Sequence, residues 1–194
     1  EFPLAELEAA KEHLKKALAL RPTHVQCLVS ARRLHLLTGE LSANLPLLEA
    51  QLRQTESPGG RVTLLREKAE LLTRLGKSTE AISAREQLTT LQPDRAAPLA
   101  ELALALWRAG KAHDAATHLR RSAEALSHAP QLAAILLGLA ARIVESVDKD
   151  AAAATELAKS AFALAPDTTG VAAQLARLLG AQGRWLEQSE VLAH

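Results

Sequence analysis

The sequence predicts an all-α protein built as a stack of about five helix pairs. Hydrophobic residues make up 48% of the 194 residues and aromatic residues only 2%, so the core must consist mainly of Leu and Ala. Leu and Ala favour helices, whereas strands favour the β-branched and aromatic residues that are scarce here. Prolines recur every 35 to 37 residues, and glycines fall about halfway between them. A chain with this period is a stack of similar units, each of two helices.

The recurring prolines mark the boundaries between units. A proline ring cannot continue the helical hydrogen-bond ladder, so we expect each proline to follow the end of a helix. The glycines mark the chain reversal inside each unit, where a residue must be free to adopt positive φ. The prolines are Pro22, Pro58, Pro93, Pro130 and Pro166, and the glycines are Gly39, Gly76, Gly110 and Gly183.

Apolar residues recur at helical spacing between these marks, as at Leu99, Leu102 and Leu106. The apolar stripes are broad, as expected for helices that pack against neighbours on two sides. The predicted elements are a lone helix at 3–20, followed by pairs of helices at 24–38 and 41–55, 61–75 and 78–91, 95–109 and 112–127, 130–147 and 151–164, and 168–182 and 184–193.

Two of these pairs depart from the regular pattern. Pro46 lies inside the second helix of the first pair, so we expect a kink or a late helix start there. The fourth pair lacks the turn glycine, and residues 147–150 follow a first helix that is about one turn longer. We interpret residues 58–60, Pro-Gly-Gly, as a turn only.

Three short patterns recur within the units: small residues spaced along the second helix, a Leu beside a small residue in the first helix, and Gly with Ala five residues later in the turn. Examples are Ala10, Leu14, Ala17 and Pro22 for the second helix, Leu99, Leu102, Ala103 and Leu106 for the first helix, and Gly110 and Ala115 for the turn. These patterns resemble the tetratricopeptide repeat (TPR). Small residues suit the points where two helix backbones approach closely.

The resemblance implies a right-handed α-α superhelix, a TPR-like solenoid, over essentially the whole chain. The first full unit departs from the family, with Arg32 at the small position and Asn44 in place of Ala. Because the sequence begins inside the second half of a repeat, we expect a piece of a longer protein, with Glu1 and Phe2 as a cloning scar. The expected single domain contains a half repeat at 3–22 and repeats at 25–58, 62–93, 96–130, 131–166 and 169–194.

Catalytic and metal-binding motifs are missing from the sequence. It has no Gly-x-Ser-x-Gly elbow, no Gly-rich phosphate-cradling loop that ends in Gly-Lys-Ser or Gly-Lys-Thr, and no His-Glu-x-x-His pair. The single cysteine, Cys27, lies in an apolar stretch, so we expect a buried and inert thiol. We therefore expect no catalytic residue, no metal ion and no cofactor.

Charge and hydropathy limit the classes of partner. The net charge of +1 gives no argument for nucleic acid, and we expect none as a partner. We expect no apolar run that approaches the roughly 20 residues needed to cross a bilayer, and therefore a soluble protein without membrane insertion. The cytoplasm and the periplasm both stay open as compartments.

The first helices of TPR units line a concave groove, and the resemblance assigns such a groove to this chain. Arginine holds carboxylates in a planar fork, while Trp and Leu seat an apolar side chain. We therefore expect a non-catalytic protein-protein interaction scaffold that binds an acidic peptide or protein segment with an apolar anchor. The predicted groove residues are Arg33, Arg66, Glu70, Arg74, Leu104, Trp107, Arg108, Ile135, Leu139, Arg142 and Arg177.

Other functions stay open at this point. Proteins that resemble this one also bind anionic polysaccharides in bacterial export apparatus. A related helical repeat reads single-stranded RNA, although the near-neutral charge argues against it. The chain also suits the regulatory module of an enzyme whose catalytic part lies outside it. For any single arginine, pairing with a Glu of an adjacent helix is the ordinary state. A solenoid also has two open ends, so the protein could form oligomers through them.

Overall fold

The computed structural model describes residues 4–193, and side chains from residue 6 onwards. This part of the chain contains eleven α-helices and one π-helical turn, and no strand occurs within it. The all-α prediction is confirmed. The expectation that Glu1 and Phe2 are a cloning scar, and the first residue of the predicted helix at 3–20, lie outside the described residues.

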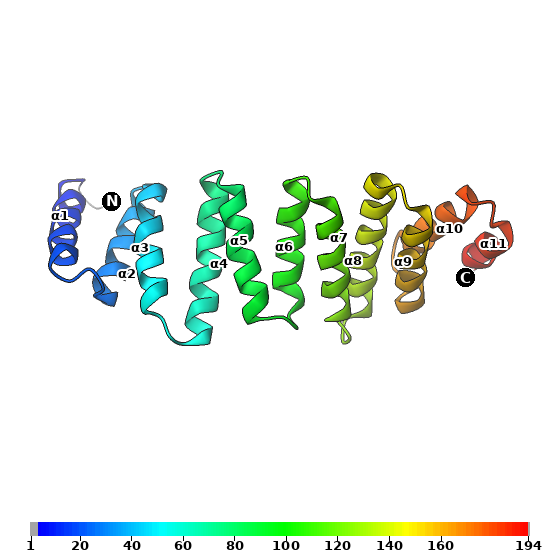
Figure 1. Cartoon of the computed structure of the whole chain (residues 1–194), viewed down its shortest axis with the longest axis horizontal. Helices are drawn as coiled ribbons and strands as arrows, with labels where there is room; N and C mark the ends of the chain where they lie inside the picture. The colour runs from blue at the N-terminus through cyan, green and yellow to red at the C-terminus, as the bar shows by residue number, and fades with distance from the viewer. Residues whose placement is uncertain (1–3, 194) are drawn as a thin grey trace. The chain divides into compact units, whose positions relative to one another are not determined.

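The helices fall into two compact units, one ending at Leu91 and the other beginning at Gln92. Within each unit, every helix packs against the next one along the chain (Figure 1). The prediction of a single continuous domain stays a prediction. Unit 1 contains α1 (Leu4–Leu20), α2 (Val25–Leu37), α3 (Leu41–Gln54), α4 (Pro58–Arg74) and α5 (Ser78–Leu91). Unit 2 contains α6 (Ala96–Arg108), α7 (Ala112–Glu124), α8 (Pro130–Ile143), the π-helical turn η1 (Val144–Asp148), α9 (Ala151–Leu164), α10 (Val171–Ala181) and α11 (Trp185–Ala193).

The turns inside the helix pairs depend on residues with positive φ. All four predicted turn glycines adopt it, with φ between 72° and 77°. In the fourth pair, which has no turn glycine, Lys149 takes the left-handed conformation with φ 54°. The longer first helix of that pair is also confirmed, because α8 continues into η1. The extra π-helical turn carries Glu145 and Ser146 beyond the point where the other first helices end.

Two of the recurring prolines follow the end of one helix and also begin the next helix. Pro58 is the first residue of α4, and the Ser57 hydroxyl caps this helix by accepting a hydrogen bond from the Gly60 amide. Our interpretation of residues 58–60 as a turn is therefore wrong. Pro130 begins α8, as predicted for the helix at 130–147, although the preceding Ala129 forms no side-chain cap. The physical reason is that the first helical position has no intrahelical use for an amide proton, so proline fits there.

Pro46 does not delay the second helix of its pair. Helix α3 begins at Leu41, as predicted for this helix, and runs through Pro46. The expected late start is therefore wrong.

A buried polar network joins α2, α3 and α4 in unit 1. The Arg32 guanidinium donates from Nε to Asn44 Oδ1 at 3.2 Å, and its Nη atoms donate to Gln51 and Glu67. Arg32 is only 8% exposed and Asn44 only 2%. The two residues that depart from the TPR pattern are thus partners, and each satisfies the other inside the helix stack.

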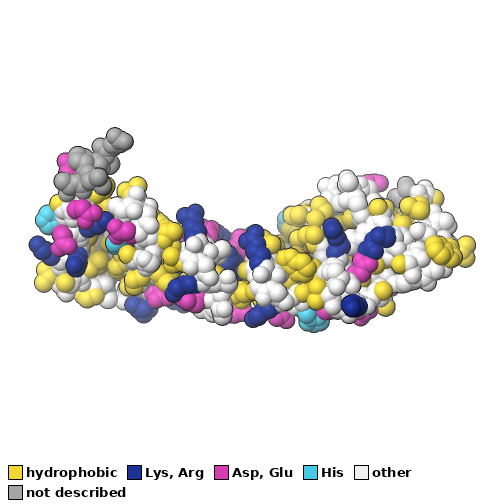
Figure 2. Space-filling view, turned by 90° about the horizontal axis from the view of Figure 1, so that it is seen from above, with side chains coloured by type: hydrophobic (Ala, Val, Ile, Leu, Met, Phe, Trp, Pro, Cys, Tyr) yellow, Lys and Arg dark blue, Asp and Glu magenta, His cyan; other side chains and the backbone are white. Residues whose placement is uncertain are grey.

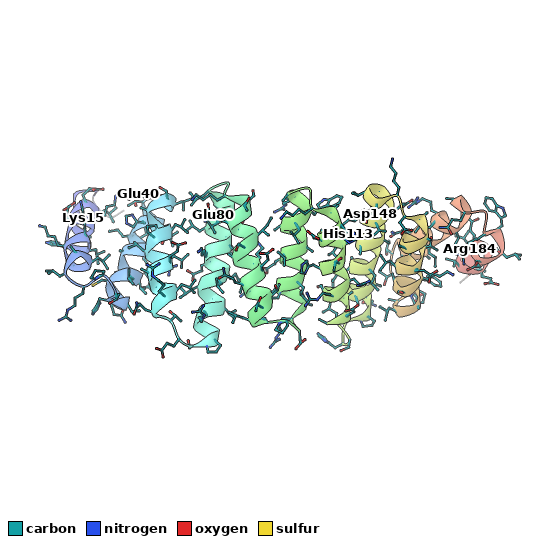
Figure 3. The ribbon with its side chains drawn as sticks, in the orientation of Figure 1. Lys15, Glu40, Glu80, His113, Asp148 and Arg184 are labelled. Carbon is teal, nitrogen blue, oxygen red and sulfur yellow. The ribbon has the colours of Figure 1, made fainter. Side chains whose placement is uncertain are left out.

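An ion-pair cluster connects α1 to the turn between α2 and α3. Lys11 on α1 donates to Glu40, and the His35 ring lies 2.8 Å from the other Glu40 carboxylate oxygen. The hydrogen bond from Lys11, followed by that from His35, lowers the pKa of Glu40. Figure 3 shows Glu40 at this turn.

Close helix packing in unit 2 depends on small side chains. Ala115 on α7 and Ala134 on α8 are fully buried, with 0% exposure. Gly138 on α8 is buried as well, and its carbonyl accepts a hydrogen bond of 2.9 Å from Gln174 Nε2 on α10. A Cβ atom at Gly138 would lie 3.1 Å from Gln174 Oε1, so the glycine permits this contact between α8 and α10.

Two further expectations need correction. Cys27 is half-buried, not buried, because it lies in the first turn of α2, where its amide donates to the capping His24 ring. The segment Pro130–Asp148, 19 residues long, is long and apolar enough to cross a membrane, which the sequence analysis overlooked. Length and composition alone are weak evidence for a membrane span. In this structure the segment packs against α7 and α9, as a core helix of the stack does.

Candidate partner-binding groove

All eleven predicted groove residues have exposed side chains in the structure. They lie on the first helices of the pairs, which are α2, α4, α6, α8 and α10. On α4 and α8, each of which carries three of them, a spacing of three or four residues, as in Leu139 and Arg142, keeps them on one face of the helix. The two units are considered separately below.

Unit 2 contains a cavity of about 670 Å³ lined by α6, α8 and α10, with one side chain from α7 and two from η1. Its interior is apolar, formed by side chains such as Leu119, Leu136 and Ile143. Its lining also includes three large hydrophobic side chains that are exposed: Leu104 at 49%, Trp107 at 44% and Leu139 at 43%. A volume of this size is typical of sites that bind small molecules or side chains of a partner.

The polar lining of this cavity comes from Arg142, Glu145, Ser146 and Arg177. Arg177 on α10 holds Glu145 on η1 in a two-pronged ion pair, with 2.6 Å between Nη1 and Oε1 and a second contact between Nη2 and Oε2. These hydrogen bonds lower the pKa of the Glu145 carboxyl, and the positive charge of Arg142 lowers it further. The same contact raises the pKa of Arg177. Both groups are therefore charged at neutral pH.

Arg142 differs from Arg177 because it forms no ion pair within the described part of the chain. Its guanidinium lies in the lining next to exposed apolar side chains, so it is available to a carboxylate of a bound molecule. Figure 2 shows hydrophobic side chains gathered beside Lys, Arg, Asp and Glu side chains over unit 2.

The structure brings together five of the seven residues predicted for unit 2. Arg108 and Ile135 are exposed but lie outside the lining of the cavity. The five that line it are Leu104, Trp107, Leu139, Arg142 and Arg177.

Sequence reasoning missed the remaining polar residues of the lining, Glu145 and Ser146. They lie on η1, one turn beyond the usual end of a first helix. Continuing the spacing of Leu139 and Arg142 by three or four residues reaches both of them, and this extension was the available signal.

The predicted residues of unit 1 do not form one site. Arg33 lines a cavity between α2, α3 and α4, whereas Glu70 and Arg74 line a smaller one of about 160 Å³. Both cavities contain the Arg32–Glu67 ion pair, so much of their polar lining is already satisfied. Arg66 lies in neither of these linings.

Comparison with solved structures relates this fold to known proteins. YrrB, described as a TPR protein with an unusual peptide-binding site, matches with a TM-score of 0.55 and 17% identity over 93% of this chain and 85% of that one. A putative kinesin light chain with TPR-like repeats from Podospora anserina matches with a TM-score of 0.56 and 21% identity over 89% and 93%.

The chain has the tetratricopeptide-repeat fold. A chain of the Naa15/Naa10 complex bound to HypK-THB extends this likeness, with a TM-score of 0.72 and 16% identity over 97% of this chain and 28% of that much longer one. No family model and no curated protein sequence matches the chain. The resemblance to TPR proteins inferred from residue patterns is thus confirmed at the level of the fold.

Proposed function

We propose that this chain is a non-catalytic scaffold that binds a short acidic segment of a partner protein in the cavity of unit 2. The observation that carries the proposal is a single cavity that combines Arg142, which has no ion pair among the described residues, with the exposed apolar side chains of Leu104, Trp107 and Leu139. An apolar side chain of the partner fills the cavity and a neighbouring carboxylate pairs with Arg142.

Burial of an apolar anchor supplies most of the affinity in this arrangement. Large hydrophobic side chains are exposed here in the free chain, and covering them removes apolar surface from water. The charge pair with Arg142 lies at the edge of the cavity, where solvent screens it, and it contributes chiefly to orientation and specificity.

The TPR neighbours support a peptide or protein as the partner. YrrB is described as having a peptide-binding site, and the Naa15/Naa10 complex was solved with HypK-THB bound. An anionic polysaccharide also has carboxylates for Arg142, but it offers little apolar surface to cover Leu104 and Leu139. The apolar lining therefore favours a peptide segment.

Fluorescence anisotropy with a defined peptide panel tests the proposal. The panel contains labelled 12-residue peptides with one Leu, Phe or Trp beside a single Glu in a Ser/Gly background. Two control peptides replace the apolar residue by Ala or the Glu by Gln. We expect micromolar to submillimolar binding of at least one anchor peptide, and weaker binding of both control peptides.

Two charge reversals locate the site. Arg142→Glu should raise the Kd of the bound peptide about tenfold, because an attractive pair becomes a repulsive one. Arg120→Glu makes the same charge change on α7, outside the cavity, and should leave the Kd within about twofold. Failure of every anchor peptide to bind, or equal losses in the two variants, would contradict the proposal.

A further inference from the structure

The acidic residue Glu145 is the unexpected feature of the cavity in unit 2. The predicted groove of this unit carried arginines and apolar residues only, yet a carboxylate lines the cavity. It lies on the π-helical turn η1, and π-helical turns occur often at functional sites. Here the turn places Glu145 opposite Arg177 of the next first helix.

The contact between these two residues uses the paired donors that Arg177 would offer to a ligand. Both Nη atoms of Arg177 donate to the two oxygens of the Glu145 carboxylate. A bound carboxylate could not form the same fork without displacing Glu145. If it approached without displacing Glu145, two carboxylates would lie next to each other, which is unfavourable.

Arg142 is left as the one cation of this lining that has no ion-pair partner in the described part of the chain. Removing the negative charge at position 145 would leave Arg177 without its ion-pair partner as well. Two guanidinium groups, on α8 and α10, would then face a bound segment.

We propose that Glu145 selects the charge of the bound segment, so that the cavity prefers one carboxylate beside the apolar anchor over two. The inference rests on the proposed function, since it names the residue that sets the specificity of that same site. Glu145 acts by occupying Arg177, and the preference for a single carboxylate follows from Arg142 alone being available.

A purely structural role for the ion pair makes a different prediction. If the pair only joined η1 to α10, its loss would lower the stability of unit 2 and weaken all peptides to a similar degree. The ratio of two affinities separates these roles, because a general loss of stability cancels in the ratio.

The experiment compares two peptides that share the best anchor from the panel, one with a single Glu beside it and one with a Glu on each side. Each Kd is measured for the unaltered chain and for Glu145→Gln, which keeps the shape of the side chain and removes its charge. Glu101→Gln is the matched control, because Glu101 is exposed on α6 and lies outside the cavity lining.

We expect the unaltered chain to bind the single-Glu peptide at least as tightly as the two-Glu peptide. Glu145→Gln should shift the ratio of the two Kd values about tenfold in favour of the two-Glu peptide, whereas Glu101→Gln should shift it less than about twofold. A second substitution, Arg177→Gln, leaves Glu145 unpaired and should weaken both peptides. Adding it to Glu145→Gln should remove the gain for the two-Glu peptide.

The outcomes distinguish the two proposals. If the unaltered chain binds neither peptide, the proposed function is wrong and this inference fails with it. If it binds the single-Glu peptide but Glu145→Gln shifts the ratio no more than Glu101→Gln, the function stands and the inference is overturned.

Discussion

Gly110 and Gly138 show two different physical needs for a glycine in this chain. Gly110 has φ +77°, and a Cβ atom added there would meet nothing within 4 Å. Gly138 does not adopt positive φ, but its added Cβ would lie close to Gln174 at the contact between α8 and α10. The turn position therefore needs a backbone angle, and the helix position needs space.

The first prediction tests the angle requirement at Gly110. Gly110→Ala should lower the free energy of unfolding by about 1 kcal/mol, because the left-handed conformation is unfavourable for an L-residue with a Cβ atom. Gly59→Ala is the matched control, since Gly59 is exposed in the first turn of α4 and its Cβ would also meet nothing within 4 Å. This control should keep or raise the stability. Urea unfolding measures the free energy of unfolding of both variants. Equal losses of stability in Gly110→Ala and Gly59→Ala would show that the positive φ of Gly110 does not cause the loss.

At the contact between Arg32 and Asn44, a buried polar pair takes the place of two small residues. Two small residues at these positions would let the helices pack directly, as the TPR resemblance implies. This chain instead places a buried guanidinium from α2 against a buried amide from α3. Either residue alone would leave a polar group inside the stack without its partner.

The second prediction is therefore energetic coupling between α2 and α3. Arg32→Ala and Asn44→Ala should each cost about 1–3 kcal/mol, because each leaves a buried polar group unsatisfied. The double substitution restores small residues at both positions and should cost at least about 0.5 kcal/mol less than the sum. Urea unfolding of the four proteins measures this coupling.

A neighbouring pair of residues serves as the control for this cycle. Arg33 and Ser42 are exposed on the same two helices. Their Ala substitutions should be nearly neutral and additive. Additive losses at Arg32 and Asn44 would show that the contact contributes no coupling.

Local patterns predicted most of the helices, and long-range contacts account for what they missed. Helix ends and turns depend on nearby residues, so the observed boundaries lie within three residues of the predicted ones when η1 is counted with α8. Pro58 was misread because its effect depends on whether it follows or begins a helix. The Arg32–Asn44 contact looked like two separate departures from a family pattern, since nothing local reveals that two such residues meet.

The candidate site was predictable to a similar extent. The groove positions on the first helices were carried over by register from the TPR resemblance, and Leu104, Trp107 and Arg142 are among those that line the cavity. The Glu145–Arg177 pair was not predicted, because it depends on an extra π-helical turn and on a contact between residues 32 positions apart. Repeat patterns describe what the units share, whereas this pair belongs to one interface only.

Over the whole molecule, five of the predicted arginines form no ion pair within the described part of the chain: Arg33, Arg66, Arg74, Arg108 and Arg142. The net charge is only +1, so these arginines are a local feature of the first helices. They lie in both units, yet only Arg142 lines the cavity with the exposed apolar side chains. A short anchored peptide and a long acidic partner should therefore respond differently to the arginines of unit 1.

The third prediction separates the contributions of the two units. Arg66→Glu combined with Arg74→Glu should change the Kd of the short anchor peptide less than about twofold at 0.15 M salt, because neither side chain lines the cavity of unit 2. The peptide's apolar anchor is held in unit 2, so reversing exposed charges in unit 1 removes no direct contact. Lowering the salt to 0.01 M weakens the screening of all charges, so any long-range effect of this double variant should be larger there. Anisotropy titrations at both salt concentrations, with Arg142→Glu measured alongside, provide the comparison.

If the unit 1 variant loses as much affinity as Arg142→Glu at 0.15 M, the binding surface extends beyond the cavity of unit 2, and the arginines of α4 contact the peptide directly.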